Sequence, residues 1–491
     1  MVSQEILDTY DMTIGIECHV QLATDTKLFS GADNDARDRS PNSVVSPIDF
    51  GLPGMLPVLN RKAVDLAIMA GKALNAEIAR VSRFDRKHYF YPDLPKGYQT
   101  TQMYHPIILA GFIDAPLEDG TSVRVRIHHA HMEEDAGKLT HYDGYSLVDL
   151  NRAGTPLIEI VSEPDIHSAA AAKAYAAELH RLMTYAGVTR GDLYHGNMRF
   201  DVNVSVAKKG ATELGTRAEV KNLNSFKSVE KAAEYEFRRQ VERIESGERV
   251  IQETRGWDEA KQITNSQRSK EDAQDYRYMP DADIPPIILS QEEISEIQAL
   301  VPTLPPEYRQ KWSTFIDTSI MNALLAVEPF ARAVLEVQDR YGDTHAKRAA
   351  NWLTSVVKRS DEDENFMSDK KVDLSGLDIN VEGLYELSKM VEASELSSTA
   401  AKQVLLDIIG NPSLDPRSIA QERNLLQVSD EGFVAGIVDA VLADPASARS
   451  VTDIKEGKDK AIGYLVGQVM KKSQGKANPA MARELIRKKL N

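Results

Sequence analysis

The hydrophobic pattern of the chain changes near residue 290, and this change limits the possible folds more than any single motif does. Before it, short stretches of alternating apolar and polar residues are separated by helical stretches. After it, only helical patterns remain, and the change follows Pro285-Pro286. The sequence therefore predicts an α+β fold class, with a mixed α/β domain over residues 1–290 followed by all-α domains. The length of 491 residues suits two to four domains.

Two stretches alternate clearly enough to predict half-buried β-strands. In residues 13–22, Cys18 falls on the apolar face, whereas Glu17 and His19 share the polar face. Residues 199–206 repeat this pattern. Their polar face carries three side chains that can line a site: Arg199, Asp201 and Asn203.

Shorter signals predict the remaining elements. Further strands are expected over residues 122–128 and 157–161. Three capping side chains precede helical patterns in the first 290 residues: Asn60, Ser168 and Ser225. Three later helices are predicted to start where Asp or Asn stands before a proline: Asp415-Pro416, Asp444-Pro445 and Asn478-Pro479. The dense charge of residues 358–371 predicts an exposed loop.

Charge and cysteine content limit the class of protein. The net charge of -15 argues against a surface that is coated by nucleic acid, but it allows a local basic patch. Residues 451–491 hold ten Lys or Arg and four Asp or Glu, a net charge of +6. The single cysteine, Cys18, excludes an intrachain disulfide and a zinc site built from cysteines. No signal peptide or membrane-spanning run is found, so we expect a cytoplasmic protein.

Three acidic features could carry chemistry, and each has a plainer interpretation. Glu17 and His19 could share a divalent cation, or they could lie on a solvated strand face. Residues 131–135, His-Met-Glu-Glu-Asp, could bind Mg²⁺ with nucleotide phosphates, or they could form an exposed turn. Glu159 stands inside an otherwise apolar stretch, where a carboxylate needs a partner, a metal or an open sheet face.

Residues 84–99 interleave cations with aromatic residues. This composition suits phosphate contacts combined with stacking on bases, and it equally suits a turn that is packed by its own Tyr and Phe side chains. Two other patterns are missing from the sequence. There is no Gly-x-x-x-x-Gly-Lys-Ser/Thr loop, and Cys18 falls on an apolar strand face that does not suit a glutaminase nucleophile.

Together these segments closely resemble the B subunits of bacterial glutamyl-tRNA(Gln)/aspartyl-tRNA(Asn) amidotransferases, nearly from end to end. The resemblance rests on several long blocks: IGIECHVQL (14–22), FGLPGMLPVLN (50–60), FDRKHYFYPDLPKGYQ (84–99), HMEEDAGK (131–138), LVDLNRAGTPLIEIVSEPDI (147–166), KNLNSF (221–226), QETRGWDEA (252–260), DYRYMPDADIPP (275–286) and GKDKAIGYLVGQVMKKSQGKANP (457–479). It implies three domains: a cradle over residues 1–290, a helical domain over 291–412 and a basic, tRNA-binding helical tail over 413–491.

The resemblance also implies a reaction. A partner amidase, the A subunit, releases ammonia from glutamine, and a small C subunit completes the complex. The B subunit uses ATP and Mg²⁺ to phosphorylate the side-chain carboxylate of misacylated Glu-tRNA(Gln) or Asp-tRNA(Asn), and ammonia then displaces the phosphate. An acyl phosphate is needed because a carboxylate oxygen is a poor leaving group. An alternative to tRNA binding stays open for the basic tail. Its Lys and Arg side chains could simply form the solvent-exposed faces of the helices.

Site residues follow from the family blocks and from the strand alternation. The expected catalytic residues are Glu17, His19, Lys87, Glu134 and Glu159. The expected Mg²⁺ ligands are His19, Glu133, Glu134 and Glu159, with the choice between Glu133 and Glu134 left open. The expected nucleotide or acceptor-end contacts are Arg86, Lys87, Asn151, Arg199, Asp201 and Asn203.

The chain departs from the family pattern at one place. Many relatives carry a zinc knuckle made of two cysteine pairs between the first two blocks. The corresponding positions here are Ser30, Ala32, Ser46 and Asp49, so no zinc is expected. We expect this loop to be held by packing through Pro47 and Pro53. We do not expect the synthetase-like domain that is inserted in archaeal E-type relatives, because the chain is too short for it.

Overall fold

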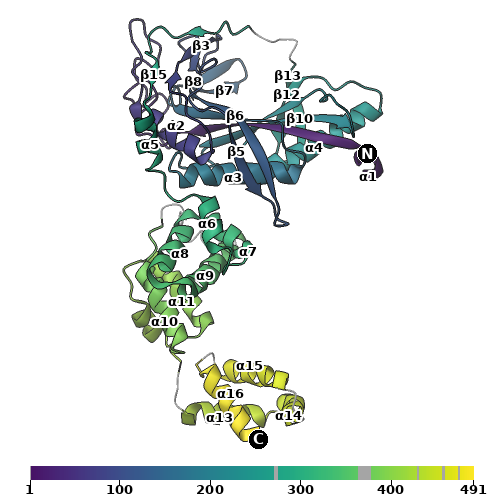
Figure 1. The fold of residues 1–491 in the computed structure, drawn as a ribbon, viewed down its shortest axis with the longest axis vertical. Coiled ribbons are helices and arrows are strands. Elements are labelled where there is room, and N and C mark those ends of the chain that lie inside the picture. Colours follow the sequence, from purple (N-terminus) through teal and green to yellow (C-terminus); the bar gives the residue numbers. More distant parts are fainter. Residues whose placement is uncertain are drawn as a thin grey trace. The chain divides into compact units, whose positions relative to one another are not determined.

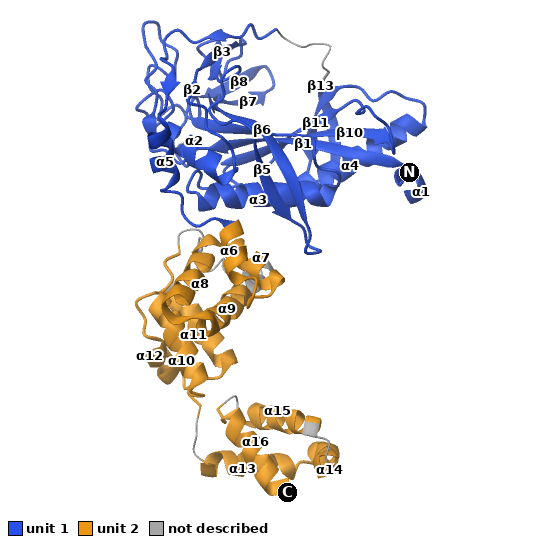
Figure 2. Cartoon of the chain, in the orientation of Figure 1, with its two compact units in different colours: residues 1–305 blue, residues 306–491 orange. Residues whose placement is uncertain are grey.

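A computed structural model describes residues 2–269, 275–362, 377–427, 431–455, 459–473 and 476–490. The chain divides into two compact units, residues 1–305 and 306–491, which Figure 2 colours separately. The first unit is mixed α/β and the second is helical, so the predicted fold class is confirmed. This division does not test the three domains with boundaries after residues 290 and 412, which stay a prediction.

The first unit is built on one eight-stranded sheet with the order β13-β12-β11-β10-β1-β9-β6-β5. Neighbouring strands are antiparallel except β11 and β12, which are parallel. The strands are β1 Tyr10–Gln21, β5 Gly111–Pro116, β6 Ser122–Glu134, β9 Pro156–Ser162, β10 Met198–Lys208, β11 Ala218–Leu223, β12 Glu253–Asp258 and β13 Ile263–Ser269. The four strands expected from alternation are therefore present as β1, β6, β9 and β10.

Alternation along β1 separates a core face from a polar face. The apolar residues Ile14, Ile16, Cys18 and Val20 are buried, while the residues between them are partly exposed. Cys18 is fully buried in the core, as expected, and burial raises the pKa of its thiol. A buried thiol with a raised pKa does not suit nucleophilic catalysis.

Two long helices cover the core face of this sheet (Figure 1). Helix α3 (Ala169–Tyr185) packs on β5 and β6, and helix α4 (Phe226–Glu245) packs on β10, β11 and β13. Their predicted N-caps are confirmed, because the side chains of Ser168 and Ser225 accept hydrogen bonds from Ala171 N and Ser228 N. Asn60 caps α2 (Arg61–Ala73) in the same way.

Smaller elements border the polar face of the sheet. A three-stranded sheet has the order β14-β3-β4, and β4 contacts β6. The small strands are β2 Val81–Ser82, β3 Asp85–His88, β4 Tyr98–Thr101, β7 Lys138–Tyr142, β8 Tyr145–Asp149, β14 Met279–Pro280 and β15 Ile287–Ile288. The short helices of this unit are α1 Gln4–Leu7 and α5 Gln291–Gln298, and α5 packs on α2.

The second unit contains helices, and within its described residues no strand is assigned. Its helices are α6 Pro305–Trp312, α7 Thr318–Leu325, α8 Glu328–Tyr341, α9 Asp343–Glu362, α10 Val381–Glu392, α11 Ser398–Gly410, α12 Pro416–Glu422, α13 Glu431–Leu442, α14 Ala448–Lys455, α15 Ile462–Lys472 and α16 Pro479–Leu490. Helices α13 to α16 share a hydrophobic core of their own. Asp415 and Asn478 cap α12 and α16 as predicted, and Asp444 caps a short 3-10 helix, Pro445–Ser447, that leads into α14.

The loop expected over residues 358–371 is wrong for its first part, because α9 continues to Glu362. Residues 363–371 lie outside the described residues. Among the described helices, none combines the length and the apolar character that crossing a membrane requires.

Candidate functional site in the polar face of the sheet

The polar face of the large sheet collects most of the expected site residues because the strand register places them side by side. Glu159 in β9 pairs with His19 in β1 on one side and with His131 in β6 on the other. His19 in turn pairs with Arg199 in β10, and Glu17 pairs with Asp201. Side chains at paired positions project from the same face. Four strands that are distant in sequence therefore form one continuous polar row.

An imidazole and two carboxylates meet at the centre of this row. His19 Nε2 lies 3.3 Å from Glu159 Oε2 and 3.5 Å from Glu133 Oε1. His131 Nε2 lies 3.6 Å from Glu159 Oε2 and 3.7 Å from Glu133 Oε2. One ligand atom from each of His19, Glu133 and Glu159 lies within 4.8 Å of the others, which is a spacing that a metal ion could bridge.

The electrostatics of this group follow from its burial and its mixed charges. Burial opposes the charged form of His19, but the hydrogen bond to Glu159 and the charge of Glu133 outweigh it and raise the pKa of His19 to about 9. Burial also opposes ionisation of Glu159, but His19, His131 and Lys87 outweigh it and hold the pKa of Glu159 well below its usual range. Without a bound cation, a protonated His19 therefore balances carboxylate charge.

Glu134 does not belong to this group, although Glu133 does. The Glu134 carboxylate forms an ion pair with Lys96 and accepts a hydrogen bond of 2.9 Å from Thr100 N. Both glutamates are 4% exposed and lie in β6, so the interpretation of this segment as an exposed turn is wrong. The geometry places Glu133, and not Glu134, beside His19 and Glu159.

Lys87 in β3 approaches the same group from the neighbouring small sheet. Burial opposes its charge, but Glu133 and nearby tyrosines outweigh this effect and raise the pKa of Lys87. Its Nζ lies 4.9 Å from the centre of the Tyr276 ring. Arg86 is engaged elsewhere, because it pairs with Asp281 at 2.9 Å and with Asp283 at 2.7 Å. Its expected nucleotide contact stays a prediction.

The cation-rich segment 84–99 is partly packed by its own aromatic residues. The Arg86 guanidinium lies 4.5 Å and Lys96 Nζ lies 5.0 Å from the centre of the Tyr98 ring. Phe90 and Tyr91, in contrast, are 79% and 51% exposed and are open to a partner. The interpretation as a self-packed turn therefore holds for a part of the segment, and phosphate contacts with stacking on bases stay a prediction.

A second acidic group stands next to the first along β1. It consists of Glu17, Asp201 and Glu219, and Lys221 Nζ pairs with Asp201 at 2.7 Å and with Glu219 at 2.8 Å. Asn203 Nδ2 donates to Glu17 Oε1 at 3.1 Å. Burial, followed by the charges of Glu159 and Glu219, raises the pKa of Glu17.

The sequence interpretation missed Glu219 and Lys221, which lie in β11. Their signal was the short alternation of buried Ala218 and Val220 with the two charged residues. The sequence interpretation included His131 in the 131–135 cluster but did not name it among the expected site residues.

The other expected contacts have structural partners. Arg199 Nη2 donates to Asp135 Oδ2 at 2.7 Å. Asn151 is 3% exposed; it donates to Ser40 O at 2.8 Å and accepts from Val44 N at 3.0 Å. Arg199 thus borders the first group, whereas Asn151 holds the loop before residue 49.

The positions that correspond to a zinc knuckle in relatives meet at one carboxylate. Asp49 Oδ2 accepts hydrogen bonds from Ser30 Oγ at 3.1 Å, from Ser46 N at 2.9 Å and from Lys27 Nζ at 3.3 Å. Lys27 is fully buried. The expectation that Pro47 and Pro53 hold the loop by packing is wrong, because both prolines are exposed. A buried ion pair with hydrogen bonds holds it instead.

Comparison with known proteins identifies the family of the chain. Residues 12–295 match the family described as the GatB/GatE catalytic domain, and residues 333–490 match the family described as the GatB domain. Three similar relatives are each named as the B subunit of an aspartyl/glutamyl-tRNA(Asn/Gln) amidotransferase. They come from Trichodesmium erythraeum (42% identity, 98% of each chain covered), Lachnospira eligens (42%, 98% of this chain and 99% of the relative) and a Janthinobacterium species (44%, 98% and 99%). This chain, with its polar sheet face and helical second unit, therefore belongs to the family of the aspartyl/glutamyl-tRNA(Asn/Gln) amidotransferase B subunits.

Proposed function

We propose that this chain is the carboxylate-activating subunit of a glutamine-dependent tRNA amidotransferase. In this proposal, the side-chain carboxylate of misacylated Glu-tRNA(Gln) or Asp-tRNA(Asn) attacks the γ-phosphorus of ATP, and ADP leaves. Ammonia from a partner amidase subunit then attacks the acyl carbon, and inorganic phosphate leaves. A small C subunit completes the complex, which works in the cytoplasm.

The observation that carries the proposal is the group of His19, Glu133 and Glu159 in the polar row. Two carboxylate oxygens and an imidazole nitrogen fit a divalent cation. When Mg²⁺ is bound, it spreads the negative charge of the transferring phosphoryl group. Glu133 is buried and the side chains of Glu159 and His19 are 18% and 21% exposed, so the group is open to a ligand but admits little water that could compete with the acyl phosphate.

The remaining residues of the row would position the reactants. Lys87 keeps its charge next to Glu133 and Glu159, so it can contact a phosphate oxygen. Arg199 is held toward the group by Asp135, which restricts its rotamers before a ligand arrives. Glu134 would act by positioning, because its pair with Lys96 joins β6 to the segment that precedes β4.

The test uses the full chain assembled with its amidase and small subunits. With glutamine, ATP and misacylated tRNA, we expect His19→Ala and Glu133→Gln to lower amide formation by about a hundredfold. The partner's hydrolysis of glutamine should stay unchanged, and Arg124→Gln, in an exposed pair with Asp114, is the matched control.

A second candidate function is a tRNA-binding scaffold whose cradle carries no chemistry. Amide formation at wild-type rates by His19→Ala and Glu133→Gln would favour that scaffold and would overturn the proposed site.

A further inference from the structure

Strand β6 changes the face that its odd-numbered residues occupy just before it reaches the polar row. Ile127 is buried in the core, and so are Ala130 and Met132. The register against β9 shifts between Ile127 and His129, so β6 holds one extra residue, His128, at this point. A β-bulge of this kind re-aims the side chains that follow it. His129 therefore joins the polar row instead of the core.

The bulge brings imidazole rings into one series that leads from the exposed His128 to the polar row. His128 Nδ1 lies 2.7 Å from His129 Nδ1, and His129 Nε2 lies 3.2 Å from His131 Nδ1. The rings of His129 and His131 are stacked, with their centres 5.2 Å apart and their planes 18° apart. His129 thus holds the His131 ring by its Nδ1 side.

The other nitrogen of His131 lies beside the two carboxylates of the proposed cation group. His131 Nε2 lies 3.6 Å from Glu159 Oε2 and 3.7 Å from Glu133 Oε2. The second oxygen of Glu133, Oε1, lies 3.5 Å from His19 Nε2. His131 therefore contacts one oxygen of Glu133 and leaves the other on the side of His19. A ring that is fixed at both nitrogens restricts the rotamers of the carboxylates beside it.

His129 can hold the His131 ring without adding charge to the group. Burial, followed by His131 and His128, lowers the pKa of His129 to about 4, so its ring is neutral near pH 7. A neutral ring does not repel a bound cation. Both nitrogens of His129 also have another imidazole as their hydrogen-bond partner, so this ring is suited to orienting a metal ligand and not to being one.

We propose that His129 is a positioning residue for the cation group of His19, Glu133 and Glu159, and that it acts through the ring of His131. The inference rests on the proposed function and adds a hydrogen-bonded support to its cation site. Removing a partner that orients metal ligands typically lowers metal affinity by about 10- to 100-fold. His129 stands one residue further from the ligands, so we expect the lower end of this range.

The first experiment measures the affinity of the full chain for Mn²⁺ alone by calorimetric titration. His129→Phe keeps a ring but removes both nitrogens, and it should bind Mn²⁺ about tenfold more weakly than the wild type. His129→Gln places an amide that can accept or donate near the position of Nε2, and it should bind Mn²⁺ as the wild type does. This rescue separates a lost hydrogen bond from lost packing. Urea unfolding checks the fold of each variant, and His129→Leu replaces His129→Phe if the larger ring unfolds the chain.

A second set of variants tests whether His129 acts through His131. His131→Phe removes the nitrogens that connect His129 to the carboxylates, so it should weaken Mn²⁺ binding by itself. Adding His129→Phe to His131→Phe should cause no further loss, because both substitutions break the same connection. Additive losses of affinity would show that His129 reaches the group by another route, and they would overturn the inference.

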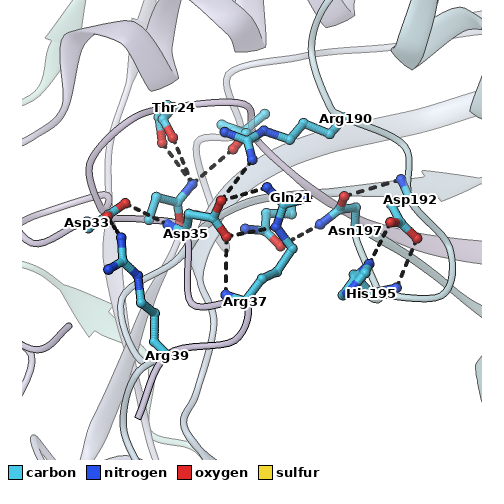
Figure 3. A network of polar contacts seen from close by, with 12 residues as sticks. Gln21, Thr24, Asp33, Asp35, Arg37, Arg39, Arg190, Asp192, His195 and Asn197 are labelled. Atoms are coloured by element: carbon cyan, nitrogen blue, oxygen red, sulfur yellow. Dashed lines mark hydrogen bonds and ion pairs between the residues drawn. The ribbon is translucent and has the colours of Figure 1, made fainter. Parts of the chain in front are cut away.

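A histidine outside this series provides the matched control. His195 Nδ1 lies 2.6 Å from Asp192 Oδ2, in the polar network that also joins Asn197 to Gln21 (Figure 3). His195→Phe removes one hydrogen-bonded imidazole, as His129→Phe does, and it should leave the affinity for Mn²⁺ unchanged.

The assembled complex gives a second readout with glutamine, ATP and misacylated tRNA. His129→Phe should raise the Mg²⁺ concentration that gives half-maximal amide formation by about tenfold. Excess Mg²⁺ should restore most of the rate, because the positioning residue affects how readily the cation site fills. A rate that stays low at saturating Mg²⁺ would contradict a role in cation binding.

The possible results are distinct. Wild-type affinity for Mn²⁺ in His129→Phe would overturn the inference, and so would equal losses in His129→Phe and His129→Gln. If the wild-type chain binds no Mn²⁺, or if His19→Ala binds it as tightly as the wild type, the proposed cation site fails and the proposed function loses its support. These outcomes separate an error about His129 from an error about the site.

Discussion

Glu133 and Glu134 are neighbours in β6, but their carboxylates have separate partners on opposite faces of the strand. Glu133 Oε1 lies 3.5 Å from His19 Nε2 in the polar row, whereas Glu134 forms its ion pair with Lys96. Successive side chains of a strand project to opposite faces, so both cannot serve one cation in this arrangement. The two residues should therefore respond differently to the same substitution.

Glu133→Gln should weaken binding of Mg²⁺ or Mn²⁺ without unfolding the protein, because it removes one charged ligand atom from the group. Glu134→Gln should instead lower the free energy of unfolding by about 3 kcal/mol, since it leaves Lys96 half-buried without its partner. Calorimetric titration with the cation and denaturant unfolding measure the two effects. A larger loss of cation affinity in Glu134→Gln than in Glu133→Gln would contradict this assignment.

Substitutions of Lys27 and Asp49 should have non-additive effects on the free energy of unfolding, because the two residues form a buried ion pair that holds the loop over residues 27–49. Lys27→Met leaves the Asp49 carboxylate with fewer donors and should lower the free energy of unfolding by about 3–5 kcal/mol. The double variant Lys27→Met/Asp49→Leu should lose less than the sum of the single variants. Urea unfolding of all three variants measures the coupling, and strictly additive losses would show that the pair is not what holds the loop.

The free energy of unfolding should decrease on acidification, in part because of His180 in α3. Burial lowers the pKa of His180, whose ring Nε2 lies 2.7 Å from Gly191 O. The unfolded chain binds the proton more readily, so the contribution of neutral His180 is complete above about pH 6.5 and is lost as pH falls through the lower folded-state pKa. His180→Gln removes this titration, so the stability difference between wild type and variant should shrink as pH falls from about 7.5 to 5.5. Urea unfolding at several pH values measures this difference. A stability difference between wild type and His180→Gln that does not change with pH would contradict the prediction.

Deleting residues 431–491 should weaken tRNA binding and reduce its salt dependence, because residues 451–491 carry a net charge of +6. The deletion starts at α13, since α12 still packs on α10 and α11. Helices α13 to α16 share their own core, so the remainder should stay folded and the partner's glutaminase should stay active. Unchanged tRNA affinity in a filter-binding assay would mean that these Lys and Arg side chains only form solvent-exposed helix faces and do not bind tRNA.

The sequence predicted the elements whose signal lies within one segment. Strands β1 and β10 alternate over many residues, and Asn60, Ser168 and Ser225 cap helices through contacts a few residues away. Strands β12 and β13 were missed, because partly exposed residues such as Trp257 interrupt any apolar alternation. A strand that pairs near a sheet edge needs fewer buried side chains, so its pattern is weaker.

The composition of the candidate site was only partly predictable, because it depends on strand register. The polar faces of residues 13–22 and 199–206 were expected, but only the pairing of β6, β9 and β1 brings Glu133, Glu159 and His19 together. The family resemblance indicated which residues belong to the site, but it did not decide whether Glu133 or Glu134 is the metal ligand.

Because the Lys27–Asp49 ion pair holds the loop over residues 27–49, this loop should differ from a zinc knuckle in the conditions that it needs for folding. A knuckle closed by cysteines forms only after zinc is delivered, and it opens when its thiolates are oxidised. The loop closed by Asp49 draws every partner from the chain itself, so it can form as soon as this part of the protein is synthesised. We therefore predict that zinc starvation and oxidative stress, which open a knuckle closed by cysteines, leave this loop folded.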